Sequence, residues 1–197
     1  MRKIICIIFL TAAVLLSPDL SAIQTLPTPV DGAAEAAADI VSCLFKDVRV
    51  EGNGFGKHTV YTCEITDAIK TRYKIGDTMT FKQPYQRFLP AYTKGEEYLI
   101  FLSGVSAEGN RTPIGLSHVY RVGKAADGSR ILRSGINREM FRDVQKRRPE
   151  FMGSLSDREK ELVKRQAERG AGDILNYDDF VSIVRKLSIS KTRNPTR

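Results

Sequence analysis

His58 and His118 are the only histidines in the chain, and their neighbours limit the chemistry they could support. A hydrolytic triad needs a serine or cysteine nucleophile beside a histidine that a carboxylate orients. Ser117 precedes His118 on an expected strand, so these side chains point to opposite faces, and no Gly-x-Ser-x-Gly motif occurs. The spacing of the histidines and cysteines matches no zinc motif. The sequence therefore predicts no catalytic residue, no metal site and no cofactor.

Two cysteines remain once the apolar N-terminal run, which contains Cys6, is set aside. Cys43 and Cys63 belong to neighbouring strand-like runs joined by a glycine-rich turn. In an oxidising compartment such a pair could form a disulfide. The alternative is a pair of buried free thiols that pack as small apolar side chains.

A loop of aromatic and basic side chains is the first candidate contact surface. It contains Tyr85, Arg87, Phe88, Tyr92 and Lys94. Rings and cations of this kind can stack on and screen single-stranded nucleic acid, but an exported protein would not meet that ligand. The loop therefore predicts either a contact with a ligand or protein partner, or a structural plug over the end of a barrel.

A basic cluster at Lys146, Arg147 and Arg148 is the second candidate contact, for anionic lipid or glycan. Lys164, Arg165 and Arg169 add further cations nearby. Acidic residues are interspersed in the same region, as Glu161 is four positions before Arg165. Mixed signs at this spacing also fit a solvated helix face.

The N-terminal 22 residues have the order of a secretory signal peptide. Arg2 and Lys3 precede 13 uncharged residues, Ile4 to Leu16, and the segment ends on the small residue Ala22. The run is shorter than the ~20 residues that span a bilayer, although a retained membrane anchor remains an alternative. We therefore expect cleavage after Ala22 and export to the periplasm or the exterior. The net charge of +8 is compatible with an anionic partner.

The rest of the chain divides into a strand-rich part and a helical part. The expected regions are a signal peptide (1–22), a lead-in (23–32), a β domain (33–136), a helical cap (137–188) and a tail (189–197). Strand patterns occur at 40–50, 59–69, 78–83, 97–103, 115–122 and 130–133. They predict a mainly β fold with α-helices, in which a small OB-like five-stranded barrel precedes the helices.

Two helix signals mark the cap. Ser156 and Glu159 have the spacing of a capping box, and Asn176 could cap a final helix. On that helix Phe180, Val184 and Leu187 share one face, which we expect to be buried. The opposite face, expected in water, carries Asp178, Asp179, Arg185 and Lys186.

The strand-rich part resembles a family of exported bacterial proteins with an OB-like barrel, the fold class that includes the N-terminal domain of tissue inhibitors of metalloproteinases. The order and spacing of short pieces, rather than any one of them, carry the resemblance over about residues 33–135. The pieces are Ala38-Asp39-Ile40-Val41, Val60-Tyr61-Thr62, Gly76 to Thr80, Gly95 to Leu102 and Pro113 to Leu116. The resemblance implies a fold. It does not imply protease inhibition, because the inhibitors use an N-terminal cysteine and the expected mature chain begins at Ile23.

These observations favour an exported, non-enzymatic binding module that contacts an unknown protein or envelope component. One alternative is an envelope-associated protein whose basic helices contact the anionic membrane surface or a glycan. Another is an enzyme whose site the sequence does not reveal. Nucleic acid is the partner class that export argues against.

Overall fold

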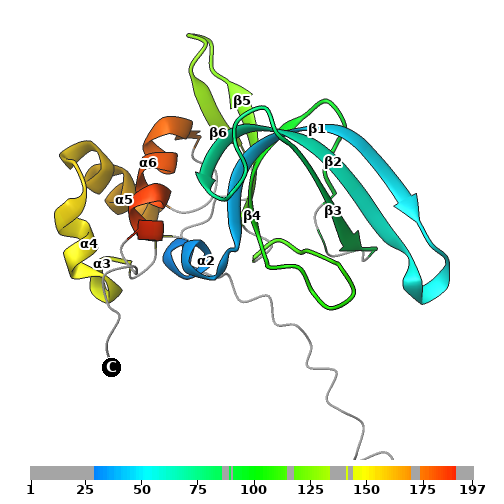
Figure 1. Ribbon diagram of the computed structural model, residues 1–197. Coiled ribbons are helices and arrows are strands. Elements are labelled where there is room, and N and C mark those ends of the chain that lie inside the picture. The colour runs from blue at the N-terminus through cyan, green and yellow to red at the C-terminus, as the bar shows by residue number, and fades with distance from the viewer. Residues whose placement is uncertain are drawn as a thin grey trace, which may run out of the picture.

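The computed structural model describes residues 29–85, 89, 91–114, 118–133, 141, 144–169 and 174–189. Helices lie to one side of a curved sheet, and the hairpin that joins the first two strands projects away from them (Figure 1). The helical elements are α2 (Val30–Ala36), the 3-10 turn η1 (Gly54–Gly56), α3 (Val144–Arg147), α4 (Pro149–Ser154), α5 (Asp157–Arg169) and α6 (Tyr177–Ile189). The strands are β1 (Asp39–Glu51), β2 (His58–Lys70), β3 (Thr78–Pro84), β4 (Glu97–Leu102), β5 (Val119–Lys124), β6 (Arg130–Arg133) and β7 (Leu175–Asn176).

The strands form one open antiparallel sheet in the order β3-β2-β1-β4-β5-β6-β7. The predicted mainly β fold with helices is confirmed, but the described strands do not form a closed five-stranded barrel. The sheet continues past β5 because β6 and the two-residue β7 add to that edge. At the other end β3 makes a single parallel bridge, from Lys82 to Asn110 in the segment after β4.

The two faces of β1 bury different sets of side chains, because successive residues of a strand point to opposite faces. Val41, Cys43 and Phe45 enter a core rich in aromatic rings, formed with β2, β3 and β4. Ile40 points the other way, into a core shared with the helices. Three register irregularities between β1 and β2 bend this long pair.

The helices pack on the second face and share its core with the sheet. In α6 the predicted apolar face is buried, with Phe180, Val184 and Leu187 all in this core. The Phe180 ring meets Tyr120 of β5 edge to face, with 5.1 Å between the ring centroids. No helix among the described residues is long and apolar enough to cross a bilayer.

The polar face of α6 contacts more of the protein than the sequence predicts. We expected Arg185 and Lys186 to face water, but Arg185 pairs with Asp67 at 2.7 Å and Lys186 donates to Glu159 at 2.5 Å. Asp179 likewise pairs with Arg158. A helix between a sheet and another helix has neighbours on both flanks, and periodicity alone does not reveal them.

Candidate functional site

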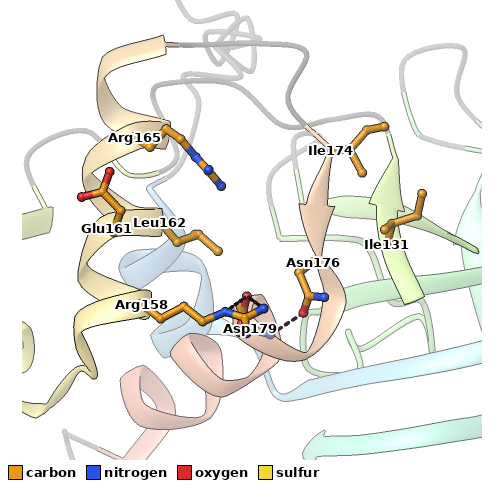
Figure 2. Close-up of a pocket in the computed structure, with 8 residues that line it drawn as sticks. All are labelled: Ile131, Arg158, Glu161, Leu162, Arg165, Ile174, Asn176 and Asp179. Carbon is orange, nitrogen blue, oxygen red and sulfur yellow. Dashed lines mark hydrogen bonds and ion pairs between the residues drawn. The ribbon is translucent and has the colours of Figure 1, made fainter. Parts of the chain in front are cut away.

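A groove between α5 and the β6–β7 edge of the sheet is the candidate binding site. It has a volume of about 440 Å³. Figure 2 shows its lining residues, which come from α5 on one side and from β6, β7 and the start of α6 on the other. They are Ile131, Arg158, Glu161, Leu162, Arg165, Ile174, Asn176 and Asp179.

The apolar part of the groove consists of three aliphatic side chains. Leu162 and Ile131 are almost entirely buried, whereas Ile174 is 62% exposed. A large aliphatic side chain exposed beside two others leaves apolar surface in contact with water. A ligand that covers Ile174 would remove that surface from water, which favours binding.

Hydrogen bonds fix the polar end of the groove. Asn176 accepts a hydrogen bond from the Asp179 N–H at 3.1 Å through its side-chain oxygen, and so caps α6 as predicted. Arg158 of α5 pairs with the Asp179 carboxylate at 2.8 Å. These contacts hold α5 against α6, while the Arg158 side chain stays 72% exposed.

Arg165 is the cation of the groove that no described residue pairs with. No residue in the described part of the chain pairs with its guanidinium, and Glu161, one turn earlier on α5, makes no ion pair with it either. In Figure 2 the Arg165 side chain extends from α5 toward β7, above Leu162, while the Glu161 carboxylate points away. A guanidinium over aliphatic side chains suits a carboxylate with apolar neighbours.

The wall formed by α5 and α6 is fixed by the capping box that the sequence predicts. Glu159 accepts the Ser156 N–H at 2.6 Å and the Ser182 hydroxyl at 2.7 Å, in addition to the Lys186 ammonium. Burial by itself would raise the pKa of Glu159, but the hydrogen bonds from Lys186, Ser182 and Ser156 lower it to about 2. Glu159 is therefore ionised at neutral pH and holds α5 to α6.

The structure separates the predicted aromatic and basic loop into different environments. Tyr85 is 54% exposed and lies under the Lys57 ammonium, while Lys94 is exposed. Tyr92 is only 3% exposed, because its ring stacks on Phe45 with 4.4 Å between centroids. Tyr92 therefore fills the aromatic core and is not available as a surface contact. Arg87 and Phe88 lie outside the described residues.

The predicted anion site at 146–148 is largely neutralised within the chain. Arg147 pairs with Asp31 of α2 at 2.8 Å, and Arg148 pairs with Glu35 of α2 at 2.6 Å. Burial by itself would raise the pKa of Asp31, but the hydrogen bond and charge of Arg147 outweigh it and lower the pKa below its usual value. Lys146 is exposed. Two of the three cations therefore hold α2 to the helices.

Cys43 and Cys63 lie on adjacent strands, as the sequence predicts, and both are buried free thiols. They are diagonal to each other, because Cys43 is opposite Ile65 and Cys63 is opposite Phe45. Burial and the neighbouring Cys63 thiol raise the pKa of Cys43 well above its usual value. Neutral, buried thiols react slowly with electrophiles, which does not suit a nucleophile.

The two histidines lie in different surroundings, and His58 Nε2 is 3.4 Å from a Glu51 carboxylate oxygen. His118 is buried with its Nδ1 2.7 Å from the Tyr120 hydroxyl, and His58 Nδ1 lies 3.1 Å from the Gly56 carbonyl oxygen. Ser117 lies outside the described residues. In the part of the chain that the structure describes, no three His, Cys, Asp or Glu side chains cluster as a metal site would require.

The groove itself was not predicted. Leu162 and Arg165 belong to a helix whose sequence is mostly charged and indicates a solvent-exposed face. Ile174 follows a glycine-rich stretch that indicates only a loop between two helices. Ile174 at the end of that stretch is the one signal that could have indicated apolar surface. No protein-family model matches the chain, and neither a curated protein nor a solved structure matches it.

Proposed function

We propose that this protein is a non-enzymatic binding module, and that its groove takes an extended segment of a partner protein in which apolar residues flank an acidic side chain. The observation that carries the proposal is the Arg165 guanidinium, which pairs with no described residue and lies beside exposed Ile174 and the apolar groove floor. The acidic side chain would pair with Arg165, and the apolar neighbours would cover Ile174 and Leu162.

The sheet edge beside the groove favours an extended ligand. β7 is the terminal strand of the sheet, so no described strand pairs with its outer edge. Neighbouring strand residues direct their N–H and C=O groups to opposite edges, and one of Leu175 and Asn176 therefore directs them outward. Addition of a partner strand to such an edge is a common way to bind peptides.

Peptide binding tests this function directly. The probe is the acetylated and amidated peptide Leu-Ile-Asp-Val-Leu, with Leu-Ile-Asn-Val-Leu as its uncharged counterpart. We expect the protein to bind the Asp peptide about fivefold more tightly, since a charge-assisted pair on a partly exposed guanidinium contributes about 1 kcal/mol. Isothermal titration calorimetry measures both affinities. Equal affinities, or no binding of either peptide, would contradict the proposal.

We also infer that the protein acts outside the cytoplasm. The charged start, the apolar run and Ala22 support this inference from the sequence. Intact-mass measurement of protein recovered from its native host should give Ile23 as the first residue. Recovery of the full-length chain from the cytoplasm would contradict export.

The finer fold assignment is likewise a proposal: β1 to β5 are an OB-like unit to which β6 and β7 are added. The order β3-β2-β1-β4-β5 and the parallel bridge between Lys82 and Asn110 support it. An experimental structure in which β3 and the segment after β4 are far apart would contradict it.

A further inference from the structure

The second half of β1 has an unpaired outer edge. β4 pairs with β1 from Asp39 to Leu44, and Phe45 completes that side with hydrogen bonds to Gly95 and Glu96. Lys46 lies at a register irregularity, and from Asp47 to Glu51 β1 pairs with β2 alone. No other backbone hydrogen bond joins residues 46–51 to a described residue. This stretch, residues 46–51, is called the β1 edge below.

The β1 edge is on the hairpin that projects away from the helices (Figure 1). Its sequence alternates charged and apolar residues, so Asp47, Arg49 and Glu51 share one face and Val48 and Val50 share the other. Val50 is 50% exposed, and Val48 packs at the margin of the aromatic core. An edge of this kind offers backbone donors and acceptors together with a partly exposed apolar face.

The charges along the β1 edge are complementary to those of a second, antiparallel copy. If Val48 of one copy faces Val48 of the other, Arg49 lies opposite Asp47 of the second copy. If the pairing is centred on Val50, Arg49 lies opposite Glu51. Pairings centred on a charged residue, such as Asp47 or Arg49, place like charges opposite one another, whereas opposite charges across an antiparallel pair are stabilising.

The net charge of the edge also permits self-association. Lys46 and Arg49 balance Asp47 and Glu51, so two copies of the β1 edge do not repel each other. Within one chain Arg49 already lies between two carboxylates, 3.0 Å from Glu51 and 3.9 Å from Asp47. The same guanidinium, 59% exposed, can also reach a carboxylate of the facing strand.

We propose that the β1 edge is an interface between two copies of this chain, which pair antiparallel about a twofold axis centred on Val48 or Val50. The pairing joins the two sheets into one. Val48 faces Val48 of the other copy in the first register, and Val50 faces Val50 in the second. Because a single strand contact is smaller than the interfaces of stable dimers, the dimer forms in a concentration-dependent way.

Charge exchange across the edge tests this proposal. The full chain is expressed and the resulting protein is purified. Sedimentation equilibrium at protein concentrations up to about 1 mM gives the dissociation constant of the dimer. Arg49→Glu leaves only acidic residues at the three charged positions, and the double variant Asp47→Lys, Glu51→Lys leaves only basic ones. We expect each variant alone to dimerise at least about tenfold more weakly than the wild type. An equimolar mixture of the two should associate about as well as the wild type.

The control is Lys164→Glu, which makes the same change of charge on α5, and it should dimerise as the wild type does. Urea midpoints establish that each variant is folded. A wild type that stays monomeric up to about 1 mM would overturn the proposal. The proposal would also be overturned if Arg49→Glu dimerised as tightly as the wild type, or if the acidic and basic variants failed to associate when mixed.

Discussion

The hydroxyl oxygens of Tyr177 and Ser42 lie 2.5 Å apart, although the two residues are 135 positions apart in the chain. Tyr177 is the first residue of α6 and Ser42 is in β1, so this contact fixes the start of the helix to the centre of the sheet. Tyr177 also lies 3.0 Å from Asp67 of β2 and donates a hydrogen bond to its carboxylate. Burial raises the pKa of Tyr177 well above its usual value, which keeps the phenol protonated as a donor.

Tyr177→Phe should lower the free energy of unfolding by about 1–3 kcal/mol, because Ser42 and Asp67 lose a buried hydrogen-bond partner. Urea denaturation measures the change. Tyr85→Phe is the matched control, since Tyr85 is exposed, and it should stay within about 0.5 kcal/mol of the wild type. Equal urea midpoints for the two variants would mean that the contact at Tyr177 does not stabilise the fold.

Val184→Asp should destabilise the protein by several kcal/mol. Val184 is completely buried in the core between α6 and the sheet, so the new carboxylate would be buried without a partner. Asp178→Asn, at an exposed position in the first turn of the same helix, is the control and should change stability by less than about 1 kcal/mol. If urea unfolds both variants alike, α6 is not part of the cooperative core.

Acid should destabilise the protein through Glu159. Its pKa is about 2 in the folded protein and 4.5 in a free chain, so its ionised form stabilises the fold above about pH 4.5. This contribution, of the order of 2 kcal/mol, is lost as the pH falls from about 4.5 toward 2. Glu159→Gln should therefore be less stable than the wild type at pH 7, and the difference should narrow as the pH approaches 2. A difference that is independent of pH would contradict this assignment.

Cys43 and Cys63 should stay reduced. Diagonal neighbours in an antiparallel pair have Cα atoms about 7–8 Å apart, at or beyond the ~7 Å limit for a disulfide. Iodoacetamide should therefore modify neither thiol in the native protein and both after denaturation without reductant. Mass spectrometry counts the adducts. Lack of modification after denaturation would mean that the two cysteines are bridged.

Much of the sheet follows from local patterns. Alternation and turn residues place β1 to β4 within one or two residues, because these strands bury one or both faces and their turns contain glycine. β7 has only two residues, Leu175 and Asn176, which is too short for any period to appear. The sequence also could not show that the sheet stays open, because contacts between distant segments decide which strands are added to its edge.

The candidate groove could not be predicted from the sequence either, because it also depends on contacts between segments that are apart in the chain. Arg165 is on α5 and Ile174 immediately precedes β7, and the packing of α5 against α6 brings the two to one groove. The charged residues at 146–148 were recognised in the sequence, but the ion pairs that Arg147 and Arg148 make with α2 were not. Their partners Asp31 and Glu35 are more than 100 positions earlier, so local charge patterns could not reveal the pairing.

A double-mutant cycle between Arg165 and the acidic residue of the peptide is the most direct test of the binding function. Isothermal titration calorimetry measures the wild type and Arg165→Gln with the Asp and Asn peptides, and Lys164→Gln, the adjacent exposed cation, is the control. We expect the wild type and Lys164→Gln to prefer the Asp peptide about fivefold and Arg165→Gln to have no preference, which corresponds to a coupling of about 1 kcal/mol. A preference for the Asp peptide that persists unchanged in Arg165→Gln would contradict the account.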